Sequence, residues 1–245
     1  MAVAYDQVAH IYKEIRDSDT WYFQYVGDYT FFKIIGDVTE KAIFDFGCGE
    51  GTHARIFKQM GAKRVVGVDI SQKMLELAKE AEAINPLGIE YIQGDMCELG
   101  EFGSFDLGVS FSVLSTIPTK EQLLKVCQAI YANLKPQGRY VTVGLNPDLS
   151  PDIWQLLVES FPTSRIEFFQ EDPVRFIEIV DEKECIFEDY LLKRETYEWA
   201  FRTVGFKDIC WHPPRVSPEG VQNFSKELLQ IYINHQFLVG LECFK

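Results

Sequence analysis

The sequence lacks the features that mark secreted, membrane-spanning and metal-clustering proteins. Its first residues, MAVAYDQVAHIYKEIRD, contain no apolar segment of the kind that a secretory signal needs. Nowhere do about 18 apolar residues run together, as a membrane span requires. Six cysteines are scattered through 245 residues without a C-x-x-C pair, which argues against a zinc cluster or a disulfide framework. We therefore expect a cytoplasmic protein with no membrane partner and no bound metal.

Positive charge is also scarce. The chain has 24 Lys and Arg against 37 Asp and Glu, a formal net charge of −13. The resulting field repels phosphate backbones, so nucleic acid is not an expected partner. No repeat, low-complexity segment or Pro/Gly-rich linker divides the chain, and 47% hydrophobic content is enough for one core. We predict a single domain over residues 1–245.

What the sequence does contain is an alternation of strand and helix patterns. Apolar runs predict strands at about 41–46, 64–68, 89–92, 105–111 and 139–145. Helical spacing predicts helices between them, at about 52–60, 71–84 and 119–133, with Ser71 as an N-cap and Lys135-Pro136-Gln137-Gly138 as a turn. Strands that are apolar throughout and alternate with helices indicate a parallel sheet covered on both faces.

The segments before and after this alternating core have patterns that differ from it. Helices are predicted at about 5–16 and 20–35, before the first strand. After Leu145 the alternation breaks, and residues 146–193 contain four prolines and strand-like stretches at about 165–169, 174–180 and 185–193. This pattern predicts an antiparallel insertion over a ligand crevice. A helix at 195–204, strands at about 206–211 and 236–244, and a helix at about 218–232 between them would complete the sheet.

A glycine-rich segment follows the first predicted core strand. It reads Asp45-Phe46-Gly47-Cys48-Gly49-Glu50-Gly51-Thr52 and opens a helix, where glycines let the backbone approach a ligand closely. Asp69 ends the second strand, where its carboxylate can bind both hydroxyls of a ribose, and Asp95 follows the third. NAD sites share the loop and the first acid, but they do not require Asp95, and they usually space the glycines as G-x-G-x-x-G. The spacing here is G-x-G-x-G.

The chain at this point resembles the class I S-adenosylmethionine-dependent methyltransferases. The likeness is carried by DFGCGEG (45–51), VVGVDIS (65–71), YIQGDM (91–96), FDLGVSFSVL (105–114) and NLKPQGRYV (133–141). Within that superfamily it is similar to small-molecule enzymes of bacterial secondary metabolism, including the toxoflavin-type N-methyltransferases. The resemblance implies an α/β, Rossmann-like fold with a mostly parallel seven-stranded sheet, an antiparallel last strand and an α+β insertion over the active site. It divides the domain into a helical cap (1–38), a core (39–145 and 194–245) and a substrate-covering insertion (146–193).

The resemblance also implies S-adenosylmethionine as cofactor and S-adenosylhomocysteine as product. The glycine loop would lie beneath the amino-acid part of the cofactor, Asp69 would hold its ribose, and Asp95 and Met96 would frame its adenine. The full set of predicted cofactor-binding residues is Tyr5, Tyr12, Asp45, Gly47, Cys48, Gly49, Asp69, Ile70, Met74, Asp95, Met96, Phe111 and Ser112. Taken singly, each glycine or acid can equally serve only a turn or a cap.

The chemistry leaves the catalytic residues undetermined. A methyl group on a sulfonium is already activated, so the protein must mainly align an acceptor and exclude water. The candidates for a general base are His212, His235 and Tyr22, and each is equally consistent with a packing or surface role. The stretch after the fourth strand contains Ser115 and Thr116, which can bind a substrate but are not bases at neutral pH.

Aromatic residues of the second helix and the insertion are the predicted substrate walls. The predicted substrate-binding set is Trp21, Tyr22, Tyr25, Ser115, Trp154 and Phe168, although each aromatic singly fits a hydrophobic core as well. We interpret the acidic residues between 167 and 189, Asp189 included, as a solvated face. The predicted function is methyl transfer to a nitrogen or oxygen of a small molecule by a monomer or homodimer. The alternatives are an NAD-dependent oxidoreductase and a non-catalytic cofactor-binding subunit.

Overall fold

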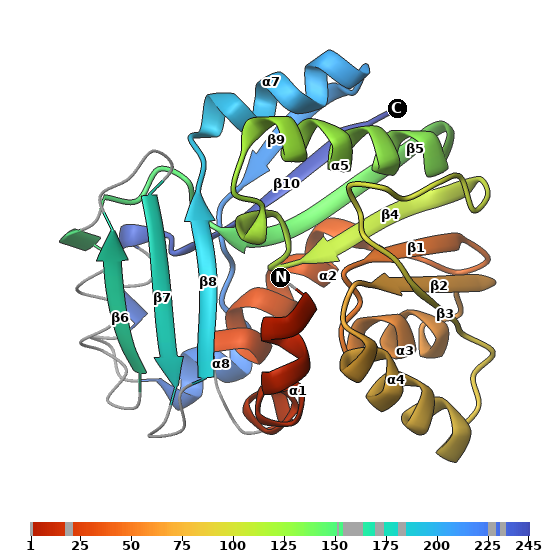
Figure 1. Cartoon of the computed structure of the whole chain (residues 1–245), viewed down its shortest axis with the longest axis horizontal. Coiled ribbons are helices and arrows are strands. Elements are labelled where there is room, and N and C mark those ends of the chain that lie inside the picture. The colour runs from red at the N-terminus through yellow and green to blue at the C-terminus, as the bar shows by residue number, and fades with distance from the viewer. Residues whose placement is uncertain are drawn as a thin grey trace.

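A seven-stranded sheet forms the centre of the molecule (Figure 1). The computed structural model describes residues 2–17, 22–150, 152–153, 164–169, 174–180, 185–224, 229–230 and 234–245. The sheet has the order β3-β2-β1-β4-β5-β10-β9. Its strands are β1 (Ala42–Phe46), β2 (Arg64–Asp69), β3 (Glu90–Gln93), β4 (Phe105–Phe111), β5 (Leu134–Leu145), β9 (Lys207–His212) and β10 (Leu238–Phe244). The first five strands pair in parallel and β10 is antiparallel to both its neighbours, which confirms the predicted sheet.

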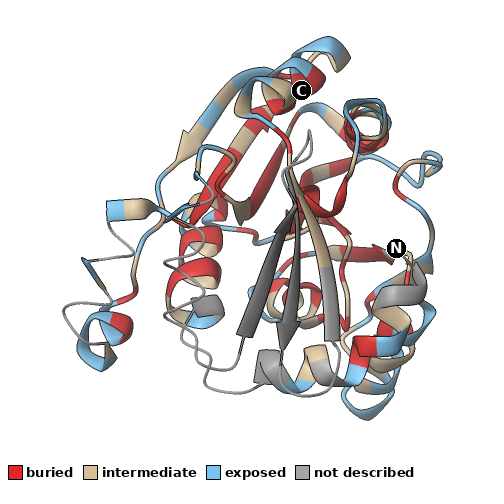
Figure 2. Cartoon of the chain, turned by 60° about the vertical axis from the view of Figure 1, so that its left-hand side comes forward, coloured by how far each residue is buried: buried red, intermediate tan, exposed pale blue. Residues whose placement is uncertain are grey.

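Helices cover both faces of this sheet. They are α2 (Tyr29–Ile35), α3 (Thr52–Gln59), α4 (Gln72–Ile84), α5 (Lys120–Asn133) and α7 (Arg194–Val204). The short helix α8 (Pro218–Asn223) contacts the segment 22–28, and a 3-10 turn, η2 (Leu114–Thr116), follows β4. One core cluster packs α5 and α7 against the sheet, and a second packs α2 and α3 against its other face. Figure 2 shows the buried residues concentrated on the strands and on the inward sides of these helices. The ends of the central strands are therefore held in place by a packed core on both faces of the sheet.

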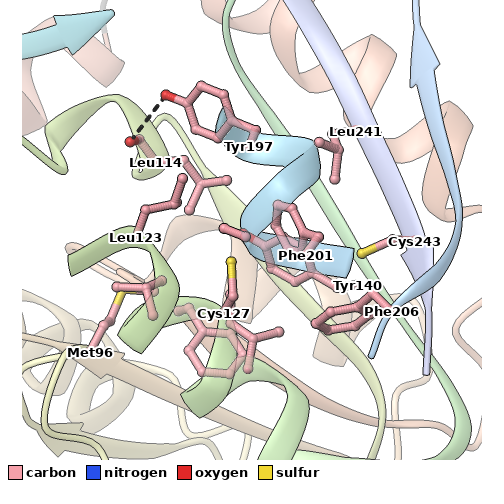
Figure 3. Packing of buried hydrophobic residues seen from close by; sticks show 14 of the residues in the cluster. Met96, Leu114, Leu123, Cys127, Tyr140, Tyr197, Phe201, Phe206, Leu241 and Cys243 are labelled. Atoms are coloured by element: carbon pink, nitrogen blue, oxygen red, sulfur yellow. Dashed lines mark hydrogen bonds between the residues drawn. The ribbon is translucent and has the colours of Figure 1, made fainter. Parts of the chain in front are cut away.

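The core beneath α5 and α7 fixes the position of η2. Phe201 of α7 stacks on Tyr140 of β5 at 5.7 Å between ring centroids, and the Tyr197 hydroxyl approaches the Leu114 carbonyl oxygen of η2 at 3.5 Å (Figure 3). Both Phe201 and Tyr140 are fully buried. Burying one such side chain contributes roughly 1.5–3 kcal/mol, so η2 is fastened to a stable part of the molecule.

Two local departures from the sequence expectation have clear causes. β5 begins at Leu134, not at 139, because Leu134 already pairs with Phe105 of β4. The register then shifts, and Gln137 takes a positive φ of 67°, so the predicted turn is a bulge within the strand. The predicted helix over 20–35 is two pieces in the described part, a π-helical stretch η1 (Tyr22–Asp28) followed by α2.

Two further elements lie beside the carboxyl ends of the central strands. The first is helix α1 (Ala2–Asp17). The second is an antiparallel sheet of β6 (Ser164–Phe169), β7 (Val174–Val180) and β8 (Cys185–Leu191), in that order. Strand β8 contacts both η2 and α1, and α1 also contacts α4, so α1 stands between the two sheets (Figure 1). None of the described helices is long and apolar enough to cross a membrane.

Candidate active site

The glycine loop between β1 and α3 is held by hydrogen bonds from its own backbone. The amides of Gly47 and Cys48 both donate to the carbonyl oxygen of Val68 in β2, at 2.8 and 3.0 Å. Gly47 has a φ of +70°, and a Cβ placed there would lie 2.5 Å from Val113. The loop therefore needs glycine at this position both for its left-handed backbone and for its close approach to the segment after β4.

Asp69, at the end of β2, bridges this loop to the start of α4. Its Oδ2 accepts the amide of Gly49 at 2.8 Å, and its Oδ1 accepts the amide of Ser71 at 2.8 Å. Burial raises the pKa of Asp69, and the two backbone hydrogen bonds oppose that rise. The carboxylate is thus oriented in advance, with its remaining lone pairs available on the side that lines a pocket.

Asp45 and Glu50 add two more buried acids beside Asp69. Asp45 is 2% exposed, and its Oδ2 makes no hydrogen bond within the part of the chain that the structure describes. Burial, together with the smaller effects of the charges of Asp69 and Glu50, raises the pKa of Asp45 to about 8. No described cation contributes to the pKa of Asp45 or Asp69. An orphaned carboxylate oxygen in an acidic surrounding fits a cationic ligand and disfavours an anionic one.

A pocket enclosing about 730 Å³, partly open to solvent, lies at the carboxyl ends of β1, β2 and β4. Its lining is Tyr5, Tyr12, Gly47, Gly49, Asp69, Ile70, Met74, Gly94, Asp95, Met96, Phe111, Ser112, Val113, Thr116 and Ile117. The structure thus brings together the predicted cofactor-binding residues apart from Asp45 and Cys48. Asp45 belongs to β1, and the Cys48 side chain packs against Gly67 of β2.

Helix α1 closes one side of the pocket with Tyr5 and Tyr12. It is fastened through Asp6, whose Oδ1 accepts the Ser71 hydroxyl at 2.6 Å and the Lys73 amide at 3.1 Å. Ser71 is itself the N-cap of α4 and accepts the Met74 amide at 3.2 Å. The same helix terminus that presents Asp69 therefore also holds the N-terminal helix over the pocket.

The opposite side of the pocket is formed by the segment after β4. Ser112 takes a positive φ of 54° while its amide donates to Val143, an uncommon backbone for a residue other than glycine. Thr116 and Ile117 line the pocket, whereas Leu114 and Ser115 line a second, smaller cavity together with Tyr197. The turn η2 therefore separates two hollows.

The predicted base and substrate residues are mostly placed elsewhere. His212 lies 3.3 Å from Glu242, His235 packs near Phe237, and the Tyr25 ring packs edge-on against Phe224 below α8. These three residues line neither cavity. Trp21 and Trp154 lie outside the described residues, and for Tyr22 and Phe168 only the backbone is described. Ser115 lines the second cavity.

Within the acidic stretch that we interpret as a solvated face, the structure describes side chains only at Glu188 and Asp189, and both are half-buried. Asp189 lies on β8, the strand that contacts both η2 and α1. Burial raises the pKa of Asp189 to about 6; the Ser115 hydroxyl opposes this rise and the charge of Glu188 adds to it. The sequence carries no signal for this placement, because β8 reaches η2 only through the tertiary fold.

Several functional positions were missed by the sequence analysis. Val113, Ile117 and Gly94 line the pocket, and Asp6 fastens α1. The first two follow directly after the fourth strand, so the rule that ligands bind at the carboxyl ends of parallel strands was a usable signal. Asp6 offered none beyond its place in the YDQ segment. Among the described residues, no group of His, Cys, Asp and Glu side chains is placed to hold a metal ion.

Comparison with known proteins agrees with this geometry. Residues 43–138 match a family model described as a methyltransferase domain. The chain is 25% identical to an N-demethylindolmycin N-methyltransferase of Streptomyces griseus over 72% of this chain and 75% of that protein. It is 29% identical to a ribosomal protein L11 methyltransferase of Caldicellulosiruptor saccharolyticus over 51% of this chain, but it spans only 38% of that protein's length. The solved structure of the CcbJ methyltransferase from Streptomyces caelestis shares the fold with a TM-score of 0.68, at 14% identity, over 98% of this chain and 96% of that one.

The fold, the domain match and the related enzymes together assign the protein to a class. Residues 43–138 are a methyltransferase domain, and the chain has the Rossmann-like fold of S-adenosylmethionine-dependent methyltransferases. This match is evidence against the alternative of an NAD-dependent oxidoreductase.

Proposed function

We propose that the chain transfers a methyl group from S-adenosylmethionine to a nitrogen or oxygen of a small molecule, as a cytoplasmic enzyme of secondary metabolism. The observation that carries the cofactor's placement is the set of three acids beside the glycine loop, with the Asp45 Oδ2 left without a hydrogen bond. S-adenosylmethionine carries a sulfonium and an ammonium, whereas NAD would bring an anionic pyrophosphate to the same place. The acids favour the first of these ligands.

Different residues of the pocket would bind different parts of the cofactor. Asp69 would accept hydrogen bonds from the ribose hydroxyls through the lone pairs that Gly49 and Ser71 leave available. Asp95 would accept from the adenine amino group with Oδ2, because its Oδ1 already accepts the Cys97 amide at 2.8 Å. The bound cofactor supplies an electrophilic methyl group. The protein's own contribution is to orient the acceptor and to exclude water with α1 and the second sheet.

A small acceptor is favoured over a macromolecule by three observations. The indolmycin-related enzyme aligns over most of its length, whereas the ribosomal protein enzyme aligns over little more than a third of its own. The net charge of −13 opposes nucleic acid. Strand β8 and helix α1 stand against the pocket edge, so residues 146–193 would cover the acceptor and 1–38 the cofactor. A monomer or homodimer suffices for this arrangement.

Calorimetry tests the proposal with S-adenosylhomocysteine and NAD as separate ligands. We expect the first to bind and the second not to bind. Asp69→Ala should weaken S-adenosylhomocysteine binding by about 1–3 kcal/mol, because two or more hydrogen bonds to the ribose are lost. Asp37→Ala, an exposed acid remote from the pocket, is the control and should bind normally. N-demethylindolmycin is the first acceptor to assay, with release of S-adenosylhomocysteine as the readout.

Failure of S-adenosylhomocysteine to bind the wild-type protein would refute the cofactor assignment. Unchanged affinity in a folded Asp69→Ala variant would instead refute only the placement of the ribose.

A further inference from the structure

The second cavity lies on the other side of η2 from the main pocket. It is enclosed by the end of β5, by β9 and β10, by α7 and by η2. Most of its lining is apolar, and it includes the rings of Tyr197 and Trp211, which meet edge to face at 6.3 Å between centroids. Sheets of this kind bind ligands at the carboxyl ends of their parallel strands, and the end of β5 lies here.

Three buried hydroxyl groups lead from the core to this cavity. The Ser110 hydroxyl lies 2.5 Å from the Tyr140 hydroxyl and 2.8 Å from the Thr142 hydroxyl. Tyr140 and Ser110 are fully buried, whereas Thr142 is 5% exposed and lines the cavity. Among the described residues, these hydroxyls have no hydrogen-bond partner outside the group, and Ser110 is its middle member.

This hydroxyl chain has one hydrogen more than its two hydrogen bonds use. Each hydroxyl carries one hydrogen, so the third must point elsewhere. At Tyr140 or Ser110 it would be buried in the core without an acceptor, which is costly. The favourable arrangement therefore runs from Tyr140 through Ser110 to Thr142. In that arrangement the Thr142 hydroxyl presents its hydrogen to the second cavity.

Gly144 leaves open space at the border between the cavity and the main pocket. It lines the cavity, and a Cβ placed on it would meet only one atom within 4 Å, the Cα of Ser112 at 3.9 Å. Ser112 itself lines the main pocket. Neither the backbone nor crowding requires glycine here, because the φ of Gly144 is not positive and a side chain would have room. The fold alone therefore gives no reason for the missing side chain.

We propose that the second cavity binds the flat, apolar part of the methyl acceptor, and that Thr142 orients it by donating a hydrogen bond to a carbonyl oxygen or ring nitrogen. The acceptor would pass Gly144 and Ser112 into the main pocket, where its reacting atom meets the cofactor. The aromatic rings of Tyr197 and Trp211 suit such a molecule. The inference rests on the proposed function and names its substrate class: a flat, largely apolar molecule with a hydrogen-bond acceptor.

The test uses two ring probes, acetophenone and toluene, of which only acetophenone carries a carbonyl acceptor. Binding is followed by NMR in the protein saturated with S-adenosylmethionine that carries an isotopically labelled methyl group. The indole N–H signal of Trp211, identified by its loss in Trp211→Phe, reports occupation of the cavity that this ring lines. We expect both probes to shift this signal in the wild type.

Two variants separate the hydrogen bond from the open space. Thr142→Val removes the hydroxyl and should weaken acetophenone binding about fivefold while leaving toluene binding unchanged. Gly144→Val fills the space beside Ser112 and should weaken both probes by at least about tenfold. Gly100→Val is the matched control, because Gly100 also has room for a side chain but lines neither cavity, and it should bind both probes normally.

The labelled methyl group connects the cavity to the reaction. If the cavity holds part of the acceptor, acetophenone should shift the methyl signal of the bound cofactor together with the Trp211 signal. Both shifts should saturate at the same acetophenone concentration, because they report a single binding event.

Four results would overturn the proposal. The first is the absence of a Trp211 shift in the wild type with either probe up to about 5 mM, where millimolar binding is measurable. The second is an equal effect of Thr142→Val on both probes, which would mean that Thr142 only shapes the cavity. The third is normal binding by Gly144→Val. The fourth is a Trp211 shift without a methyl shift, which would mean a site separate from the reaction. Failure of the proposed function is distinct, because the labelled cofactor would then not bind the wild type at all.

Discussion

The pocket has two walls that are constructed in different ways. The loop wall, residues 45–51 with 69–71, is made by consecutive residues whose backbone amides fix one another and fix Asp69. The η2 wall, residues 112–117 with β8, is assembled from two segments that are far apart in the chain and meet only in the folded structure. Local backbone geometry therefore provides the wall that would hold the cofactor. Tertiary packing provides the part that can select an acceptor.

Substituting Gly47 of the loop wall tests how tightly this wall packs against the η2 wall. Gly47→Ala should destabilise the protein by about 2–4 kcal/mol, since a left-handed backbone costs roughly 1–2 kcal/mol and overpacking against Val113 adds a similar amount. Thermal unfolding measures the effect. Gly88→Ala is the matched control, because Gly88 also has a positive φ (+76°) but nothing lies within 4 Å of an added Cβ. Equal losses in the two variants would show that the two walls do not press on each other at Gly47.

Neutralising the buried acid of the loop wall should change how stability depends on pH. The folded-state pKa of Asp45, about 8, lies above its ordinary value near 4. Between these pH values the folded protein holds a proton that the unfolded chain releases, so stability from this group is present at low pH and lost as the pH rises towards 8. Asp45→Asn removes this loss. We expect the melting temperature of the cofactor-free variant to gain on the wild type as the pH rises.

The cofactor should respond to the same substitution in the opposite direction. Asp45→Asn should weaken S-adenosylmethionine binding about tenfold above about pH 8, where Asp45 is ionised and the cationic ligand loses a buried negative charge. The effect should be smaller at about pH 6, because Asp45 is protonated there in the cofactor-free protein. For the pH dependence of thermal stability, Asp37→Asn is the control. The Asp37 carboxylate is exposed and its pKa is lowered by hydrogen bonds from Thr39, so the melting temperature of this variant should not gain on the wild type as the pH rises. A parallel pH dependence in wild type and Asp45→Asn would contradict the assigned cause.

The difference between the walls also explains what could be predicted from the sequence. Periodicity predicts the order of strands and helices, because it depends on neighbours in the chain. The rule that ligands bind at the carboxyl ends of parallel strands predicts the glycine loop and the placement of Asp69 and Asp95 in one pocket. The half-buried position of Asp189 could not be predicted, because acidic clusters usually face solvent and the contact of β8 with η2 is made only by the tertiary fold. His212 was a plausible base by position at a strand end. Its partner Glu242 lies on β10, thirty residues away, and this pairing cannot be read from spacing.

The smallest effect should come from the contact that joins α1 to the loop wall. Asp6→Ala removes the acceptor of the Ser71 hydroxyl and the Lys73 amide, and should cost about 0.5–1.5 kcal/mol. Ser71 still caps α4, so the core should melt nearly as before, while amide hydrogen exchange in α1 speeds up and S-adenosylhomocysteine binds several-fold more weakly. Glu14→Ala, an exposed position on the same helix, controls for helix propensity. If Asp6→Ala binds the ligand as tightly as Glu14→Ala does, α1 covers the pocket through Tyr5 and Tyr12 alone, and the closing of the two walls does not depend on the α4 terminus.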